Sequence, residues 1–144
     1  MTKRAQATAR TTLPVSLDAA WSALADHEAM AGWGPGIKVT VDDTRAQAPG
    51  AVGAVRTIAA PGPAPAIVEE IVTFDAPHVL GYRGVAGVPF RDYRGEVRLT
   101  PQGSGVLVEW TLSAKPRVPV MEQAALAVVS RTLLALYSRA VRKG

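Results

Sequence analysis

Cysteine is absent from this sequence of 144 residues, and histidine occurs only twice, at His27 and His78. Without cysteine there is no disulfide framework and no thiolate metal site, and the composition fits a reducing compartment, so we expect a cytoplasmic protein. The carboxylates are not clustered at ligand spacing, so we also expect no metal site. Neither histidine forms a recognisable pattern with a nucleophile, which leaves nucleophilic and metal-assisted hydrolysis without support.

Runs of one charge are equally scarce, although the net charge is +4. The sixteen Lys and Arg residues are spread along the chain, and aromatic residues make up only 6% of it and do not alternate with them. A nucleic-acid surface needs a basic patch with aromatic platforms, so we expect no nucleic-acid partner and interpret the charge as a solvated surface. The glycine-rich segment 32–36 does not follow a strand and open a helix, as a phosphate-binding loop does, and we expect no cofactor.

Long apolar stretches are limited to residues 120–141, which have the length that a membrane span needs. This stretch contains Glu122, Gln123, Arg131 and Arg139. A charge near the bilayer centre costs about 2.5–3.5 kcal/mol on insertion scales. We therefore expect no integral membrane segment and predict a buried core helix. The basic segment 1–13 lacks the apolar run of a secretory signal, and the length fits a single domain over residues 1–144.

Hydrophobic periodicity and turn residues predict an α+β domain. Ser16 is a natural N-cap for a helix that places Trp21 in the core, and a second short helical piece begins at Asp26 and ends before Gly34. Alternating or β-branched stretches bounded by Gly and Pro predict strands over residues 5–13, 37–43, 52–60, 67–74, 79–85, 93–100 and 106–112. The short connections between these strands indicate an antiparallel meander, because parallel strands need long crossovers.

The C-terminal segment has a different period. Apolar residues recur there at spacings of three and four, which predicts one apolar stripe on a helix of about 22 residues, roughly 33 Å long, lying across the sheet. The side chains expected to face the sheet are Met121, Ala125, Val128, Val129 and Thr132. Small alanine side chains in this stripe would leave room for a pocket, but alanine is also simply the best helix former.

Short motifs accompany this order of elements from about residue 6 to residue 142. They are LPVS at 13–16, AWSALAD at 20–26, WGP at 33–35, GAVR at 53–56, EEIVTFD at 69–75, YR at 82–83, YRGEV at 93–97 and GVLVEW at 105–110. In their order and spacing they resemble the polyketide cyclase/dehydrase and lipid-transport branch of the START-related SRPBCC superfamily. The resemblance implies the helix-grip fold, in which a seven-stranded antiparallel sheet wraps around a long C-terminal helix and two short helices follow the first strand. It also implies a cavity between sheet and helix for a small hydrophobic ligand.

Strand alternation sorts the side chains by face. It places Tyr82, Tyr93 and Trp110 on the inner face of their strands. For residues 67–74 the pattern is ambiguous, and the resemblance implies that Glu69, together with Arg56 on the neighbouring strand, points inward. Two charges on an apolar face need each other to offset desolvation. They form either a structural ion pair or a polar anchor for a carbonyl or hydroxyl group of a ligand.

The remaining candidates are mainly aromatic. Tyr82 and Tyr93 either bury their rings and leave their hydroxyls wet, or bind a ligand, or donate a proton to a developing enolate. Trp33, on the loop at the expected cavity mouth, and Trp110 are either core residues or stacking partners for a ligand. We name no catalytic residue, and the predicted ligand-binding residues are Trp33, Arg56, Glu69, Tyr82, Tyr93, Trp110, Met121, Ala125 and Val129.

Two functions are compatible with this site. The first is binding of a small hydrophobic ligand, a lipid, a polyketide or an isoprenoid-like compound, which needs no catalytic residues. The alternative is a polyketide cyclase/aromatase-like enzyme in which Tyr, Arg and Glu side chains of the pocket transfer protons. A third interpretation is a protein-interaction role with a vestigial cavity, and the sequence leaves open whether the chain forms a homodimer.

Overall fold

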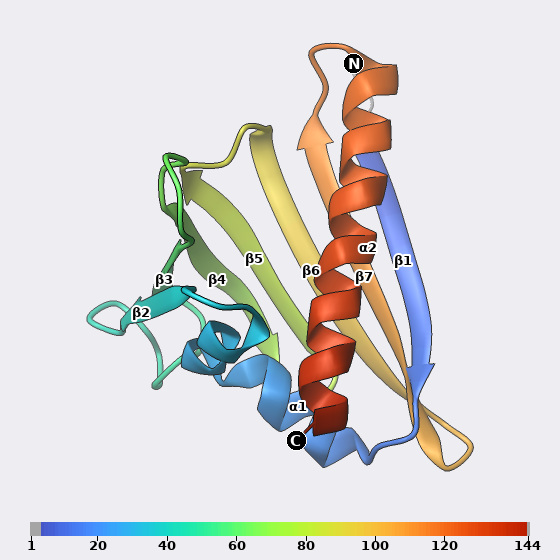
Figure 1. Cartoon of the computed structure of the whole chain (residues 1–144). Coiled ribbons are helices and arrows are strands. Elements are labelled where there is room, and N and C mark those ends of the chain that lie inside the picture. The colour runs from blue at the N-terminus through green and yellow to red at the C-terminus, as the bar shows by residue number, and fades with distance from the viewer. Residues whose placement is uncertain (1–3, 144) are drawn as a thin grey trace.

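Seven strands, two α-helices and one 3-10 helix make up the part of the chain that the computed structural model describes, residues 4–143. In chain order the elements are β1 (Ala5–Leu13), α1 (Leu17–Ala25), η1 (His27–Trp33), β2 (Lys38–Asp42), β3 (Val55–Ala59), β4 (Ile67–Asp75), β5 (Val79–Ala86), β6 (Arg91–Gln102), β7 (Gly105–Lys115) and α2 (Pro119–Lys143). Figure 1 shows the sheet curving behind α2, with α1 near the C-terminal end of that helix. The predicted element order and the helix-grip fold are confirmed.

The sheet is an antiparallel meander with its first strand added at the far end. Its order is β1-β7-β6-β5-β4-β3-β2, and every neighbouring pair is antiparallel. The strands β1 and β2 are therefore the two edges of the sheet. The register places Arg56 opposite Glu69 and Tyr82 opposite Gly95. These two cross-strand pairs position the site described below.

Local sequence signals set the two short helices. The Ser16 side chain accepts a hydrogen bond from the Ala19 N–H at 3.1 Å, so α1 begins where the capping residue predicts. The 3-10 helix η1 ends at Trp33, and the turn that follows places Gly36 at a φ of +78°. A Cβ atom at Gly36 would lie 2.4 Å from the ring of Pro61, so this turn requires glycine for its space as well as for its backbone conformation.

Two details differ from the expectations of the sequence. β3 begins at Val55 rather than at residue 52, because the preceding residues form turns, one of them closed by a hydrogen bond from the Gln47 N–H to the Val52 carbonyl. Trp21 is half-buried rather than a core residue. Its ring lies edge-on against Phe74 with the ring centroids 5.2 Å apart, at the margin of the main core.

The inner face of the sheet is the one that strand alternation predicts. Its buried side chains include Tyr82 in β5, Tyr93, Val97 and Leu99 in β6, and Val106, Val108, Trp110 and Leu112 in β7. The alternate residues of β6, Arg94, Glu96 and Arg98, are exposed on the other face. Arg56 and Glu69 are buried as well, so their implied inward orientation is confirmed.

Helix α2 crosses the inner face next to β1 and β7 (Figure 1), but it presents a different stripe from the predicted one. Its buried residues are Leu126, Ser130, Leu134, Tyr137 and Val141. Met121 and Val128, predicted to face the sheet, are 69% and 62% exposed, and Thr132 is exposed too. The N-terminal half of α2 is apolar on more than one side, so hydrophobic spacing alone could not select the side that packs.

By length and composition α2 also resembles a membrane span, with a mean hydropathy of 1.3 over an 18-residue window within Val120–Lys143. The buried 28% of that window corresponds to a single stripe directed at the sheet. This stripe packs against β1 and β7, and the neighbouring Val129, Leu133 and Leu136 form one wall of a cavity, so α2 is the core helix of the fold.

Candidate functional site

A cavity of about 320 Å³ lies between the inner face of the sheet and α2. Its lining is largely apolar and comes from η1, the strands β3, β4, β5, β6 and β7, the β5–β6 loop and α2: Met30, Trp33, Ile37, Arg56, Ile58, Ile67, Glu69, Tyr82, Val88, Pro89, Phe90, Tyr93, Trp110, Val129, Leu133 and Leu136. Enclosed, mostly apolar clefts with a few polar groups are the usual form of small-molecule sites. This cavity is therefore the candidate site.

The structure brings most of the predicted site residues together in this lining. They are Trp33, Arg56, Glu69, Tyr82, Tyr93, Trp110 and Val129. Met121 and Ala125 do not line the cavity: Met121 is largely exposed, and Ala125 is partly buried one turn before Val129. The wall that α2 contributes begins at Val129 and continues through Leu133 and Leu136, further along the helix than predicted.

Arg56 and Glu69 form an ion pair inside the cavity. They stand opposite each other in the β3–β4 register, and both the Nε and the Nη2 atoms of Arg56 lie 2.8 Å from Oε1 of Glu69. The residues are only 3% and 5% exposed. Both contacts use Oε1, so within residues 4–143 the second carboxylate oxygen, Oε2, has no hydrogen-bond partner. This oxygen is an acceptor that a ligand in the cavity can use.

His27 contacts the Arg56 guanidinium group of this ion pair. Its Nδ1 atom lies 3.2 Å from Nη1 of Arg56, and its Nε2 atom lies 2.8 Å from the Gly50 carbonyl oxygen. A guanidinium group only donates and a carbonyl only accepts, so Nδ1 is the bare nitrogen and Nε2 carries the proton. Burial lowers the pKa of His27 and the nearby Arg56 cation adds to this, while the hydrogen bond to Gly50 opposes it. The imidazole is therefore neutral and holds Arg56 in place.

Tyr82 connects the ion pair to the aromatic wall. The guanidinium carbon of Arg56 lies 4.7 Å from the centroid of the Tyr82 ring, within the range of a cation–π contact. The Tyr82 hydroxyl accepts a hydrogen bond from Nε1 of Trp110 at 3.1 Å. The ring reaches that position because it crosses Gly95, where a Cβ atom would lie 2.2 Å from Cζ of Tyr82. Glycine at this point in β6 therefore shapes the cavity.

The two tyrosines in the lining remain protonated. Burial raises the pKa of Tyr82 to about 12, and the Glu69 carboxylate adds to that effect. Burial and the neighbouring Tyr82 likewise raise the pKa of Tyr93 far above its ordinary value. Tyr93 is held by Phe90, which stacks on its ring with centroids 5.7 Å apart. Both phenols can therefore form hydrogen bonds at physiological pH but are poor sources of a proton.

Trp33 and Trp110 line the cavity, and Tyr137 packs against both of them without lining it. Trp33, Trp110 and Tyr137 pack edge-to-face, with centroid distances of 6.2, 6.0 and 5.9 Å among the three pairs. The Tyr137 hydroxyl donates a hydrogen bond to the Ala20 carbonyl at 2.6 Å and so ties α2 to α1. Trp33 is 7% exposed and ends η1, so it forms a wall of the cavity rather than part of a loop at its mouth.

Sequence analysis missed several residues of this site. His27 was given no role, because its hydrogen-bond partners are Gly50 in a loop and Arg56 in β3. Nothing in the local sequence links these three residues. Tyr137 was overlooked, although its spacing from Leu126 and Leu134 is that of the buried side of α2. The apolar β5–β6 loop, residues 88–90, was detectable only as a Val-Pro-Phe run that follows Gly87.

The fold is shared with several solved structures at low identity. The crystal structure of Ara h 8.0201 has a TM-score of 0.75 and 14% identity, over 99% of this chain and 100% of that one. A norcoclaurine synthase point mutant from Thalictrum flavum, in complex with a transition-state analogue, has a TM-score of 0.75 and 16% identity, over 99% and 94%. CalU16 from Micromonospora echinospora has a TM-score of 0.69 and 20% identity, over 98% and 84%.

These identities are low enough that the likeness concerns the fold alone. No curated protein sequence matches this chain significantly. A family model described as polyketide cyclase/dehydrase and lipid transport matches residues 4–143. That match spans every strand and helix described above and agrees with the resemblance of the sequence motifs to the SRPBCC superfamily. The chain therefore belongs to the polyketide cyclase/dehydrase and lipid transport family.

Proposed function

We propose that this protein binds one small, neutral, mostly apolar molecule that carries a hydroxyl group, in the cavity between the sheet and α2. The observation that carries the proposal is the pairing of an apolar lining with an unused charged acceptor, Oε2 of Glu69. A lipid fragment, a small polyketide or an isoprenoid-like alcohol has this chemistry. We further propose that binding takes place in the cytoplasm, in line with the lack of cysteine.

The size of the cavity limits the ligand. A cavity of about 150 Å³ holds one benzene ring, so by proportion the 320 Å³ found here suits roughly a dozen non-hydrogen atoms. That corresponds to two fused rings or one ring with a short chain. A longer ligand would extend beyond the enclosed space.

The charge of the site argues for a neutral ligand. Arg56 and Glu69 neutralise each other, and His27 is uncharged, so the lining carries no net charge. A ligand carboxylate would approach the unpaired oxygen of Glu69 and be repelled by it. A hydroxyl group would donate to the same oxygen and gain a hydrogen bond to a charged acceptor.

The protonation states of the cavity side chains favour ligand binding without catalysis. A cyclase/aromatase-like reaction needs a side chain that exchanges a proton near neutral pH. Burial keeps Tyr82 and Tyr93 protonated, and the carboxylate of Glu69 is held by Arg56. These groups suit fixed hydrogen bonds better than proton transfer.

Calorimetric titration with three matched probes tests the proposal. We expect 2-naphthol to bind at least tenfold more tightly than naphthalene, because a hydrogen bond to a charged group contributes about 1.5–3 kcal/mol. We expect 2-naphthoate to bind most weakly. Equal binding of the three probes would contradict the role of Glu69, and binding of none would contradict the cavity as a binding site.

A pair of neighbouring variants locates the binding. Val129 lines the cavity, whereas Val128, one position earlier on α2, is largely exposed. We expect Val129→Phe to fill part of the cavity and weaken 2-naphthol binding at least tenfold. We expect Val128→Phe, which adds the same side chain on the outer side of the helix, to leave the affinity unchanged. A similar loss in both variants would show that the probe binds elsewhere.

A further inference from the structure

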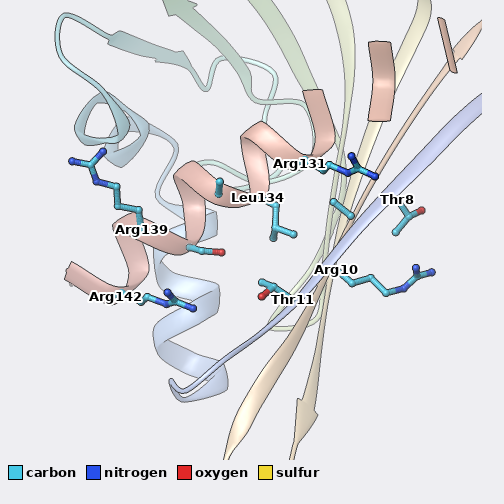
Figure 2. A pocket seen from close by; sticks show the side chains of 10 residues that line it. Thr8, Arg10, Thr11, Arg131, Leu134, Arg139 and Arg142 are labelled. Atoms are coloured by element: carbon cyan, nitrogen blue, oxygen red, sulfur yellow. The ribbon is translucent and has the colours of Figure 1, made fainter. Parts of the chain in front are cut away.

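A second concavity, a groove of about 660 Å³, lies between β1 and the C-terminal half of α2. Figure 2 shows this groove with its lining side chains, which are Thr8, Ala9, Arg10, Thr11, Arg131, Leu134, Ala135, Ser138, Arg139 and Arg142. None of these residues lines the apolar cavity, whose wall on α2 is formed by Val129, Leu133 and Leu136. The groove is therefore a separate feature, and we call it the β1–α2 groove.

One side of the β1–α2 groove is the free edge of the sheet. β1 is the terminal strand and pairs with β7 alone. At Gln6 the edge is capped: the backbone N–H donates to Oε1 of Gln123 at 3.0 Å, and Nε2 of Gln123 donates to the Gln6 carbonyl. The backbone groups of Gln6 therefore point away from β7. Alternate residues of a strand point their backbone groups the same way, so those of Thr8 and Arg10 also face the free edge.

Nothing in the described part of the chain occupies that edge beyond Gln6. The backbone N–H and carbonyl groups of Thr8 and Arg10 have no partner among residues 4–143. An uncovered row of strand donors and acceptors is a template for a further strand. The inward side chains beside it, Ala7 and Ala9, are small and leave space next to the helix.

The other side of the groove is positively charged. Arg131, Arg139 and Arg142 project from α2, and no ion pair to them is found within residues 4–143. Figure 2 shows Arg131 and Arg142 extending toward the β1 side, whereas Arg139 points away from it. The Cα atoms of Arg131 and Arg142 are about 16 Å apart along the helix, at 1.5 Å per residue. An extended strand covers that distance in about five residues.

The floor of the groove also holds an unsatisfied polar atom. The Ser138 hydroxyl oxygen is buried and has no hydrogen-bond partner, the one such side-chain atom in the described residues. Buried hydroxyl groups nearly always have a partner. A bound group with a polar atom at this depth would supply it.

We propose that the β1–α2 groove binds an extended acidic segment of another protein, which pairs with the free edge of β1 and places its carboxylates on Arg131 and Arg142. In this mode backbone hydrogen bonds provide affinity and the side-chain contacts provide specificity. A compact anion fits less well, because the two arginines stand too far apart to share it. A second copy of this chain also fits poorly, because β1 has a basic residue, Arg10, and no acidic one.

An alternating peptide provides the probe. We expect a fluorescein-labelled octapeptide of alternating threonine and glutamate to bind the full chain, measured by fluorescence anisotropy, and to bind at least tenfold more tightly than the matched threonine–glutamine peptide. We expect Arg131→Gln/Arg142→Gln to weaken binding at least tenfold and to reduce its salt dependence. No binding of the glutamate peptide, or equal binding of both peptides, would overturn the proposal.

Strand pairing is tested separately from charge. Thr8→Pro removes an edge N–H that the β1–β7 ladder does not use, a substitution that edge strands tolerate. Its control, Thr8→Ala, also loses the hydroxyl that bonds Thr111 but keeps the N–H. We expect Thr8→Pro to weaken peptide binding at least tenfold and Thr8→Ala less than twofold. Equal effects of the two variants would overturn strand addition.

A second measurement does not depend on the folding of Thr8→Pro. Two versions of the glutamate peptide carry N-methyl groups, one on its odd-numbered residues and one on its even-numbered residues. We expect one of the two to bind the unaltered protein at least tenfold more weakly than the parent peptide. If both N-methylated peptides bind as well as the parent peptide, the groove attracts the charge of the peptide without forming strand hydrogen bonds, and the strand-pairing proposal is overturned. If inorganic phosphate or a short DNA duplex displaces the peptide at lower concentration than the threonine–glutamate peptide itself, the site belongs to that anion instead.

Discussion

Removing one member of the buried Arg56–Glu69 pair should destabilise the protein more than removing both. The two side chains are only 4% and 7% exposed and 2.8 Å apart. At an effective dielectric constant of about 20, the attraction at that distance is about 6 kcal/mol. Desolvation costs several kcal/mol for each ion. Attraction and desolvation therefore nearly cancel while the pair is intact, and the cancellation fails when one partner is removed.

The variants are Arg56→Met, Glu69→Leu and the double variant. Each single variant leaves an unpaired charge in an apolar cavity, and we expect it to lower the free energy of unfolding by about 3–5 kcal/mol. The double variant has no buried charge left, so we expect it to lose less than either single variant. His27 loses its Arg56 contact in Arg56→Met and in the double variant, so that contribution cancels between these two and counts against the double only in its comparison with Glu69→Leu.

Urea denaturation followed by tryptophan fluorescence measures the three free energies. For a chain of this size, a loss of 3 kcal/mol corresponds to a fall in Tm of roughly 10 °C, so the singles and the double are readily distinguished. The coupling between the two sites should be large, because the side chains are in contact. A double variant that unfolds at a lower urea concentration than both singles would refute the reasoning.

Three further predictions concern stability. The pKa of His27 lies below 6.5 in the fold, so the stability that neutral His27 gives the fold is complete above pH 6.5. This stability is lost as the pH falls below that value and the unfolded chain takes up a proton. By comparison with His27→Gln, we expect urea denaturation from pH 7.5 to 5.5 to show a loss of at most about 1.4 kcal/mol per pH unit. We expect Gly95→Ala to displace the Tyr82 ring and cost about 1–3 kcal/mol, whereas Gly32→Ala, which meets nothing within 4 Å, should be nearly neutral; equal Tm values for both would contradict this account. Tyr137→Phe removes the hydrogen bond that ties α2 to the Ala20 carbonyl and should cost about 0.5–1.5 kcal/mol in the same assay, and an unchanged midpoint would show that the hydrogen bond contributes nothing.

The faces of the later strands could be predicted because alternation is a local property. In β7, apolar residues occupy every second position from Val106 to Leu112, so the inward position of Trp110 required no knowledge of the rest of the fold. The cap at Ser16 is local in the same sense. The inward direction of Glu69 was not predictable in this way, since both faces of β4 carry a glutamate and apolar residues.

The packed side of α2 could not be read from the sequence for a physical reason. Val128 and Val129 are identical in hydrophobicity, yet one is largely exposed and the other lines the cavity. The choice between them depends on the curvature of the sheet and on the anchor of Tyr137 to α1, which are tertiary properties. The same holds for His27, whose partners lie in two distant segments.

The side-chain amide of Gln123 also bears on how other chains can add to the edge of the sheet. An exposed edge strand invites other chains to add to it, and continued addition leads to fibrils. In β1 the amide of Gln123 imitates the peptide group of a neighbouring strand and closes the edge at Gln6. A strand that approaches β1 therefore meets a stop at one end and can pair only with a short remaining stretch. The Gln123 amide therefore limits the stretch of β1 with which any added strand can pair.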